Sequence, residues 1–117
     1  MPPSVRIVRD AITRDDLRAI AREQFGDMVK AVVDLGQGIM AVGGDLHADE
    51  EAMLLDQGSR QADLWGINLH PDAPPTARVE FDSMINVRPL QGNRSRSVED
   101  GALRARIQDV VARLVRE

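Results

Sequence analysis

Two segments of the chain repeat hydrophobic residues at intervals of three or four, the pattern of an amphipathic helix. The first is expected at about residues 14–25, with Thr13 as its N-cap and Gly26 as its C-cap. The second lies near the end of the sequence, and its hydrophobic stripe consists of Leu103, Ile107, Val110, Val111 and Leu114. A shorter helix closed by Gly58 is expected between them, at about residues 49–55.

Five further segments alternate hydrophobic and polar residues or are almost continuously hydrophobic, as β-strands are. They are expected at residues 5–8, 28–35, 39–46, 64–70 and 79–88. The sequence Gly36-Gln37-Gly38 predicts a hairpin loop with a glycine at positive φ between the second and third strands. Prolines 2 and 3 indicate that the first strand lies at a sheet edge.

The last two strands are expected to pair as a hairpin, and this pairing fixes which side chains share a face. Matching of the buried faces requires paired residues to have numbers of equal parity. The hydrophobic face should then contain Trp65, Ile67, Leu69, Phe81 and Ile85. The polar face should contain Asn68, His70, Glu80, Asp82, Asn86 and Arg88.

These elements predict one domain over residues 1–117 with the order β-α-β-β-α-β-β-α. The expected fold class is α+β, a two-layer domain with a largely antiparallel five-stranded sheet and three helices. The first and last helices should cover the hydrophobic face of the sheet.

Composition narrows the classes of function. The chain has no cysteine, which excludes disulfides, cysteine-based zinc sites and thiol nucleophiles. A net charge of -4 argues against broad nucleic-acid binding, and one Trp, two Phe and no Tyr argue against stacking of single-stranded bases. With no apolar leader and no membrane-length hydrophobic run, we expect a cytoplasmic protein that does not bind a membrane.

The first candidate site is the loop at residues 92–96 together with the start of the last helix. Free backbone N–H groups at a helix N-terminus and arginine side chains can bind a phosphate or a carboxylate, and the candidates here are Asn93, Arg94 and Arg96, with Arg88 in addition. The alternative is that Ser97 or Asp100 caps the helix and the arginines are solvated.

The second candidate site is the polar face of the sheet. Asp82 and His70 supply the carboxylate and the imidazole of an acid–base pair, and Asn68 and Asn86 supply amide donors. The alternative is a face that is polar because it contacts water. Asp45 and His47 could share a metal ion, but their spacing matches no established metal motif, so we expect no metal and no cofactor.

Four stretches of the sequence are long enough to indicate a family. They are His47-Ala48-Asp49-Glu50-Glu51, Ser59-Arg60-Gln61 continuing to Asp63-Leu64-Trp65-Gly66-Ile67-Asn68-Leu69, Phe81-Asp82-Ser83-Met84-Ile85-Asn86, and Gly92-Asn93-Arg94-Ser95. The chain resembles a family of short bacterial proteins catalogued as a domain of unknown function. The resemblance implies a small stand-alone bacterial protein and supplies no activity or ligand.

Two hypotheses about function follow. The first is a ligand-binding or hydrolytic domain that recognises a phosphate-bearing substrate, a nucleotide or RNA, through the Asn/Arg loop, with Asp82 and His70 as the acid–base groups. The second is a non-catalytic interaction module, homodimeric or bound to a partner protein. The first predicts polar side chains that converge on a pocket, and the second predicts an exposed hydrophobic patch.

Overall fold

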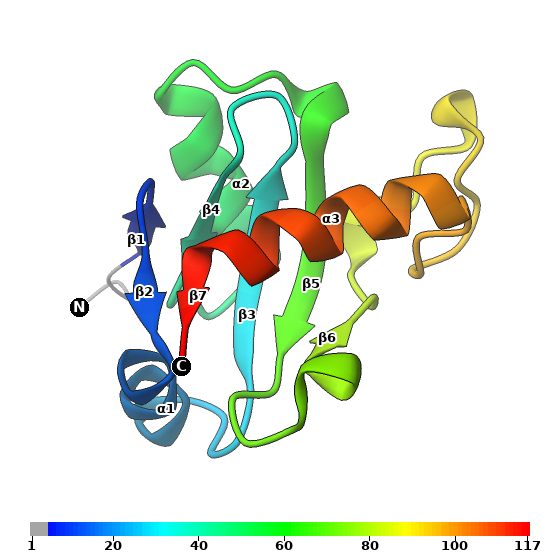
Figure 1. Cartoon of the computed structure of the whole chain (residues 1–117). Helices are drawn as coiled ribbons and strands as arrows, with labels where there is room; N and C mark the ends of the chain where they lie inside the picture. The colour runs from blue at the N-terminus through cyan, green and yellow to red at the C-terminus, as the bar shows by residue number, and fades with distance from the viewer. Residues whose placement is uncertain (1–4) are drawn as a thin grey trace.

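The computed structural model describes residues 5–117, and its centre is an antiparallel sheet of five strands (Figure 1). In spatial order these are β1 (Arg6–Val8), β4 (Ile39–Val42), β3 (Val29–Asp34), β5 (Leu64–Leu69) and β6 (Val79–Glu80). The three α-helices within the described residues are α1 (Arg14–Glu23), α2 (His47–Asp56) and α3 (Gly101–Leu114). The α+β class predicted from the sequence, with its five-stranded antiparallel sheet and three helices, is therefore confirmed.

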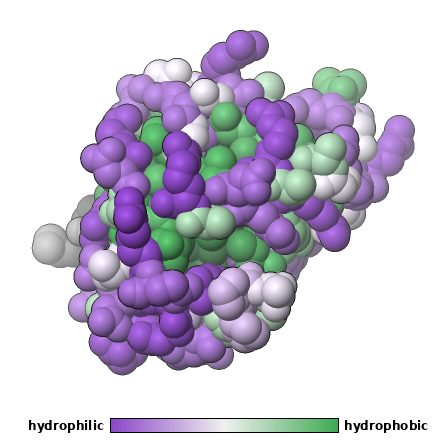
Figure 2. Space-filling model, viewed as in Figure 1, coloured by the Kyte–Doolittle hydropathy of each residue, from purple (hydrophilic) through white to green (hydrophobic). Residues whose placement is uncertain are grey.

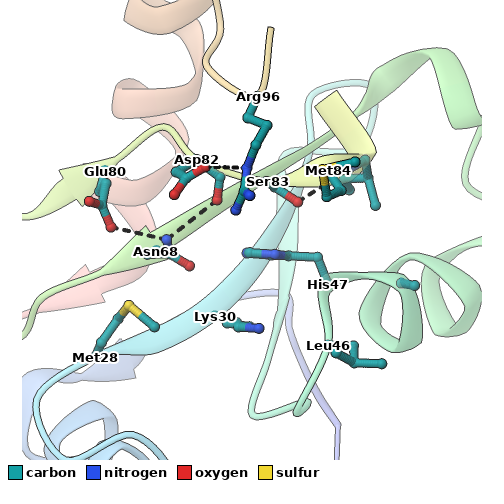
Figure 3. A pocket seen from close by; sticks show the side chains of 12 residues that line it. Met28, Lys30, Leu46, His47, Asn68, Glu80, Asp82, Ser83, Met84 and Arg96 are labelled. Atoms are coloured by element: carbon teal, nitrogen blue, oxygen red, sulfur yellow. Dashed lines mark hydrogen bonds and ion pairs between the residues drawn. The ribbon is translucent and has the colours of Figure 1, made fainter. Parts of the chain in front are cut away.

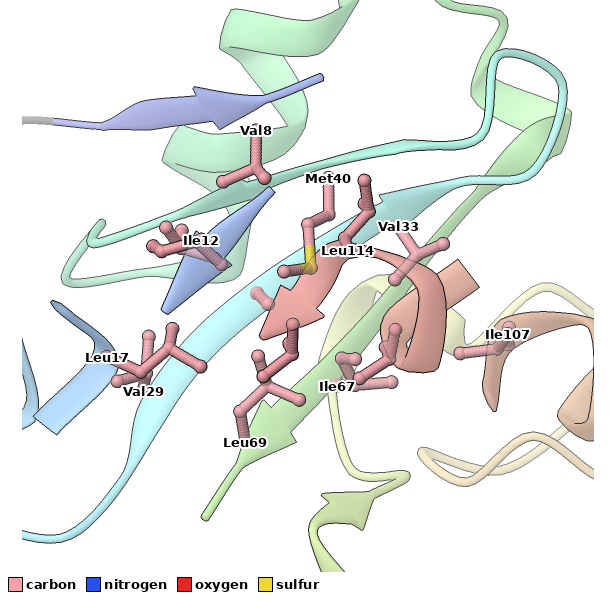
Figure 4. Packing of buried hydrophobic residues seen from close by; sticks show 14 of the residues in the cluster. Val8, Ile12, Leu17, Val29, Val33, Met40, Ile67, Leu69, Ile107 and Leu114 are labelled. Atoms are coloured by element: carbon pink, nitrogen blue, oxygen red, sulfur yellow. The ribbon is translucent and has the colours of Figure 1, made fainter. Parts of the chain in front are cut away.

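The main hydrophobic core lies between the sheet and helices α1 and α3, as predicted (Figure 4). Successive side chains of a strand point to opposite faces, and the odd-numbered residues of β3 and β5 point to this core. They meet Leu17 of α1 and three residues of the α3 stripe. The buried members of this layer include Val29, Ala31, Val33, Ile67, Leu69, Ile107, Val111 and Leu114.

The opposite face of the sheet is partly covered by α2. Val32 of β3 and Leu64 of β5 point to this side and form a smaller cluster with Leu54 of α2. Ile39 and Ala41 of β4 complete it. Because α2 reaches only part of this face, the even-numbered residues nearer the β6 edge remain free to form a site.

Several predicted caps and turns are present. Thr13 accepts a hydrogen bond from the backbone N of Asp16 at 3.0 Å and begins α1, as predicted. The helix ends at Glu23 with Gln24 as its C-cap, two residues before the predicted Gly26, which has a φ of 93°. Gly38 in the hairpin between β3 and β4 has a φ of 68°. β1 lies at a sheet edge, as predicted. The proline pair at positions 2 and 3 lies outside the described residues.

A separate parallel pair joins β2 (Ile12–Thr13) to β7 (Val115–Arg116) and was not predicted. Each strand has two residues, too few to produce a recognisable alternation. Ile12, Leu114 and Val115 are buried there, so the pair fastens the end of α3 to the start of α1.

The prediction of one long strand at residues 79–88 is wrong. β6 ends at Glu80, and the chain continues through short 3₁₀ turns at Met84–Asn86 and Pro89–Gln91. Where β5 and β6 pair, the paired residues have numbers of equal parity, as predicted. Asn68 pairs with Glu80, and Phe81 packs against the main core. Ile85 instead packs against the α2-side cluster, which corrects its predicted place beside Trp65.

The side chain of Asn86 bonds to β5 where the predicted strand is missing. Its Oδ1 accepts from the backbone N of Gly66 at 2.8 Å, and its Nδ2 donates to the carbonyl oxygen of Gly66 at 2.8 Å. One amide side chain thus makes the two hydrogen bonds that a paired backbone would make. Ser83 also lies close to this strand, because a Cβ built on Gly66 would come within 2.5 Å of the Ser83 Cβ. Local packing therefore replaces a regular ladder beside β5.

The surface on the α3 side is mainly hydrophilic, with hydrophobic residues visible in the hollows between polar ones (Figure 2). Among residues 5–117 no helix is long and apolar enough to cross a membrane.

Candidate functional site

A pocket of about 400 Å³ opens on the α2 side of the sheet, between the start of α2 and the turn at Met84–Asn86 (Figure 3). Its polar floor is a row across three strands, because Lys30 of β3 pairs with Asn68 of β5 and Asn68 pairs with Glu80 of β6. His47 enters from the start of α2. The rest of the lining consists of Met28, Leu46, Ala48, Asp82, Ser83, Met84, Ile85 and Arg96.

Asn68 is the best-fixed polar group of the pocket. Its side chain is buried, and Nδ2 donates to Glu80 Oε1 at 3.0 Å and to the carbonyl oxygen of Asp82 at 3.4 Å. Both partners are acceptors, so they fix which end of the amide faces them. The Oδ1 atom is buried and has no hydrogen-bond partner within residues 5–117. A buried acceptor without a partner is costly, which makes this atom a candidate contact for a ligand.

Arg96 reaches the pocket from the loop that precedes α3 (Figure 3). The backbone of this loop is held against the turn, since the Arg96 carbonyl accepts from the backbone N of Ser83 at 3.0 Å and from Asn86 Nδ2 at 3.0 Å. Its Nε donates to Asp82 Oδ1 at 2.7 Å, and both side chains remain about half exposed. An exposed ion pair of this kind contributes little to stability, so a competing anion could recruit the guanidinium at small cost.

His47 extends across the pocket from α2 (Figure 3). Its Nε2 lies 2.7 Å from the carbonyl oxygen of Ile67, which can only accept, so Nε2 carries the proton and Nδ1 carries a lone pair. Burial lowers the pKa of His47, although the Ile67 hydrogen bond, Asp82 and Asn68 oppose the shift. Burial therefore favours the neutral form of the ring, in which Nδ1 is a hydrogen-bond acceptor.

Glu50 lies one turn after His47 in α2 and is completely buried. One carboxyl oxygen accepts from the backbone N of Gly44 at 3.0 Å, and the other has no partner within the described residues. Burial raises the pKa of Glu50 well above its ordinary value, and the Gly44 N–H and the charge of Lys30 offset this only in part. Glu50 therefore favours its neutral form beside the paired glycines that end β4.

The predicted anion site at the start of α3 is filled by the chain's own carboxylates. Glu99 Oε2 accepts from the backbone N of Arg94 at 2.5 Å and from that of Ser95 at 3.1 Å. Asp100 Oδ1 accepts from the backbone N of Ala102 at 2.8 Å and is the N-cap of α3. These carboxylates already occupy the positive end of the helix and its loop.

Asn93 lies in the interior of the same loop and is buried. Its Nδ2 donates to the carbonyl oxygens of Asn86 at 2.7 Å, Ser97 at 2.7 Å and Ser95 at 3.1 Å, and its Oδ1 accepts from the backbone N of Glu99 at 2.9 Å. Asn86 is equally buried against Gly66. Both side chains brace the loop that carries Arg96.

The backbone of Arg88 pairs with that of Asn93, but its side chain does not line the pocket. Its guanidinium lies 4.8 Å from the ring centroid of Trp65 and donates to the carbonyl oxygens of Gln61 at 2.8 Å and Leu64 at 2.5 Å. It also lies 3.5 Å from a carboxylate oxygen of Glu51. The predicted position of Arg88 on the polar face beside Asn68 is therefore wrong, because the strand that would have placed it there ends at Glu80.

The structure thus brings together Asn68, Asp82 and Arg96 from the residues singled out in the sequence. His70 lies beside them, with Nε2 at 3.3 Å from Glu80 Oε1, but it does not line the pocket. Arg94 also does not line it. Lys30 was not predicted from the sequence as a site residue, and His47 was predicted only as a possible metal ligand. Lys30 could have been found by extending the parity argument from the last hairpin to the neighbouring strand.

Within residues 5–117 no three His, Asp or Glu side chains gather as a metal-binding set. Asp45, which the sequence paired with His47, instead accepts from Gln24 Nε2 at 3.2 Å. The chemistry that the pocket offers is hydrogen bonding and charge.

The fold and pocket describe a small α+β domain with a polar cavity beside a sheet edge. Comparison with known families matches residues 6–114 to DUF5674, described as a protein of unknown function, and the chain belongs to this family. No curated protein and no solved structure gives a match.

Proposed function

We propose that the protein binds a small phosphate-bearing ligand in the pocket between β5, the start of α2 and the loop that carries Arg96. The observation that carries the proposal is the convergence of Arg96 on a cavity that Asn68 also lines, with a buried Oδ1 that has no hydrogen-bond partner among residues 5–117. The volume of about 400 Å³ lies within the range of small-molecule sites, roughly 300–1,000 Å³.

The charges of the pocket favour an anion at its outer part. Lys30 and Arg96 are the cations of the lining, and the carboxylates are those of Glu80 and Asp82. Glu80 already accepts from Asn68, and Asp82 accepts from Arg96 Nε. The terminal N–H groups of Arg96 are left to meet a phosphate, as arginine side chains do elsewhere.

Binding is better supported than hydrolysis. Asp82 forms an ion pair with Arg96. His70 does not line the pocket and is paired with Glu80, so the two residues expected to act as acid and base do not face one another. His47 is the imidazole that lines the cavity, and its neutral form with a lone pair on Nδ1 would be the base if chemistry occurred there.

Isothermal titration calorimetry with ribose 5-phosphate and nucleoside 5′-monophosphates, at fixed ionic strength, tests the proposal. A charge-assisted hydrogen bond is worth about 1.5–3 kcal/mol, so Arg96→Gln should weaken binding by roughly 10- to 150-fold. Absence of binding to the wild type, or unchanged affinity in Arg96→Gln, would contradict the proposal.

Arg94→Gln is the matched control, because it removes the same charge from the same loop at a residue that does not line the pocket. Its affinity should stay within about threefold of the wild type, since a distant exposed charge is largely screened. An equal loss in both variants would assign the anion to the start of α3, where Glu99 now binds the loop.

A second candidate function is a protein–protein contact through residues 84–92, whose turn at Pro89–Gln91 projects from the domain (Figure 1). Leu90 is fully exposed, and Met84 is 66% exposed. Light scattering tests self-association through this surface, and a dimer that Leu90→Ser converts to a monomer would support it.

A further inference from the structure

Two hydrogen-bond acceptors line the inner end of the pocket, and Lys30, the cross-strand partner of Asn68, belongs to the same lining. Asn68 Oδ1 is buried and without a partner in the described chain, because Nδ2 is committed to Glu80 and to the Asp82 carbonyl. His47 has its proton on Nε2, where Ile67 accepts it, so its Nδ1 is an acceptor as well. A ligand group that satisfies this end must donate hydrogen bonds.

The walls around these acceptors are apolar. Met28, Leu46, Met84 and Ile85 contribute side chains to the lining, and Leu46 and Met84 remain exposed by 55% and 66%. Flexible methionine side chains pack well against flat rings. The pocket therefore combines hydrogen-bond acceptors in its interior, an apolar wall and the Arg96 guanidinium near its opening.

We propose that the inner end reads a neutral N–H group, and that the ligand is a nucleotide whose base contacts Asn68 and His47 while its phosphate contacts Arg96. This inference rests on the proposed function and adds the class of ligand to it. Enzymes that bind single bases read them in the same way, by hydrogen bonds to the base edge and contact with apolar side chains. A phosphorylated sugar could occupy the Arg96 end and donate through its hydroxyl groups, but it would leave the apolar wall empty.

The first test compares ligands on the wild-type protein by isothermal titration calorimetry. At least one of the common nucleoside 5′-monophosphates should bind 10-fold or more tightly than ribose 5-phosphate. The same nucleotide with the N–H of its base edge replaced by N-methyl should bind no more tightly than ribose 5-phosphate. Equal affinity for all nucleotides and ribose 5-phosphate, or for the methylated and unmethylated forms, would overturn the inference.

The second test uses Asn68→Leu, which removes the acceptor at similar size. In this variant the ratio of the affinity for the preferred nucleotide to the affinity for ribose 5-phosphate should fall to about one, and this ratio is the readout because Asn68 itself lines the pocket. Undiminished preference for the nucleotide in this variant would overturn the role of Asn68. If the variant does not fold, the methylated ligand on the wild type still decides.

Different results would contradict the proposed phosphate site and the proposed contact with the base. Binding of ribose 5-phosphate and nucleotides with equal strength, lost in Arg96→Gln, would retain the phosphate site and overturn only the reading of the base. No binding of either ligand would overturn the proposed function and this inference together.

Discussion

Replacement of Asn93 by alanine should destabilise the protein strongly, although the residue lies in a polar loop. The side chain is 5% exposed and makes contacts to three carbonyl oxygens and one backbone N–H. One of the three contacts made by Nδ2 is shared, so the side chain counts as three hydrogen bonds. At a net value of about 1 kcal/mol for each, the free energy of unfolding should fall by about 3 kcal/mol. For a domain of this length this corresponds to a fall in Tm of about 12 °C.

The assay is reversible thermal or urea denaturation of Asn93→Ala, followed by circular dichroism, with Arg94→Ala as the neighbouring control. Arg94 contributes its backbone N–H to Glu99 and has an exposed side chain, so its truncation should change stability by no more than about 0.5 kcal/mol. Asn93→Ala within about 1 kcal/mol of the wild type would refute the reasoning, because the buried carbonyl groups would then have found other partners.

Two further variants test other parts of the structure. Glu50→Gln should gain stability relative to the wild type as pH rises from 5 to 8. The raised pKa of Glu50 in the folded state stabilises the wild type below the ordinary pKa of about 4.5, and this stabilisation is lost as pH rises through the pKa of the folded state. Urea denaturation at several pH values measures this difference, which grows by up to about 1.4 kcal/mol per pH unit, and a constant difference would contradict the assignment. Arg88→Ala should cost about 3 kcal/mol and change the emission of Trp65, the single tryptophan, because the guanidinium covers its ring and donates to buried carbonyls. Arg88→Lys should recover less than half of this loss, since an ammonium cannot make the same set of contacts, and full recovery would show that charge alone is needed.

Much of the fold could be predicted because it follows from short-range patterns. The α1 and α3 stripes, the Thr13 cap and the turn at Gly38 are set by neighbours in sequence, and each is present. The parity of the β5–β6 pairing could also be predicted, since a shift by one residue would move Val79 and Phe81 from the main core to the face that carries Asn68.

The strand at residues 79–88 could not be ruled out from the sequence because its alternation is genuine. Tertiary contacts end β6. Ser83 packs against Gly66, and the side chain of Asn86 takes the place of a backbone partner. The same turn carries Arg88 away to Trp65.

The candidate site was predictable only where the strands are regular. Asn68 and Glu80 follow from parity. Asp82 lies beyond the end of β6, and the position of Arg96 depends on how Asn86 and Ser83 hold its carbonyl. The filling of the helix N-terminus by Glu99 and Asp100 was foreseeable in part, because acidic residues at that position compete with any ligand.

The most direct test of ligand binding in this pocket is a ¹H–¹⁵N NMR titration of the protein with a nucleoside 5′-monophosphate at constant ionic strength. Binding in the pocket predicts saturable shifts of the Asn68 side-chain amide, the Arg96 Nε–H and the backbone amides of His47 and Ser83, with the amides of Ala102 and Leu103 at the start of α3 unchanged. Shifts confined to the start of α3, or no saturable shift at the pocket residues, would contradict it.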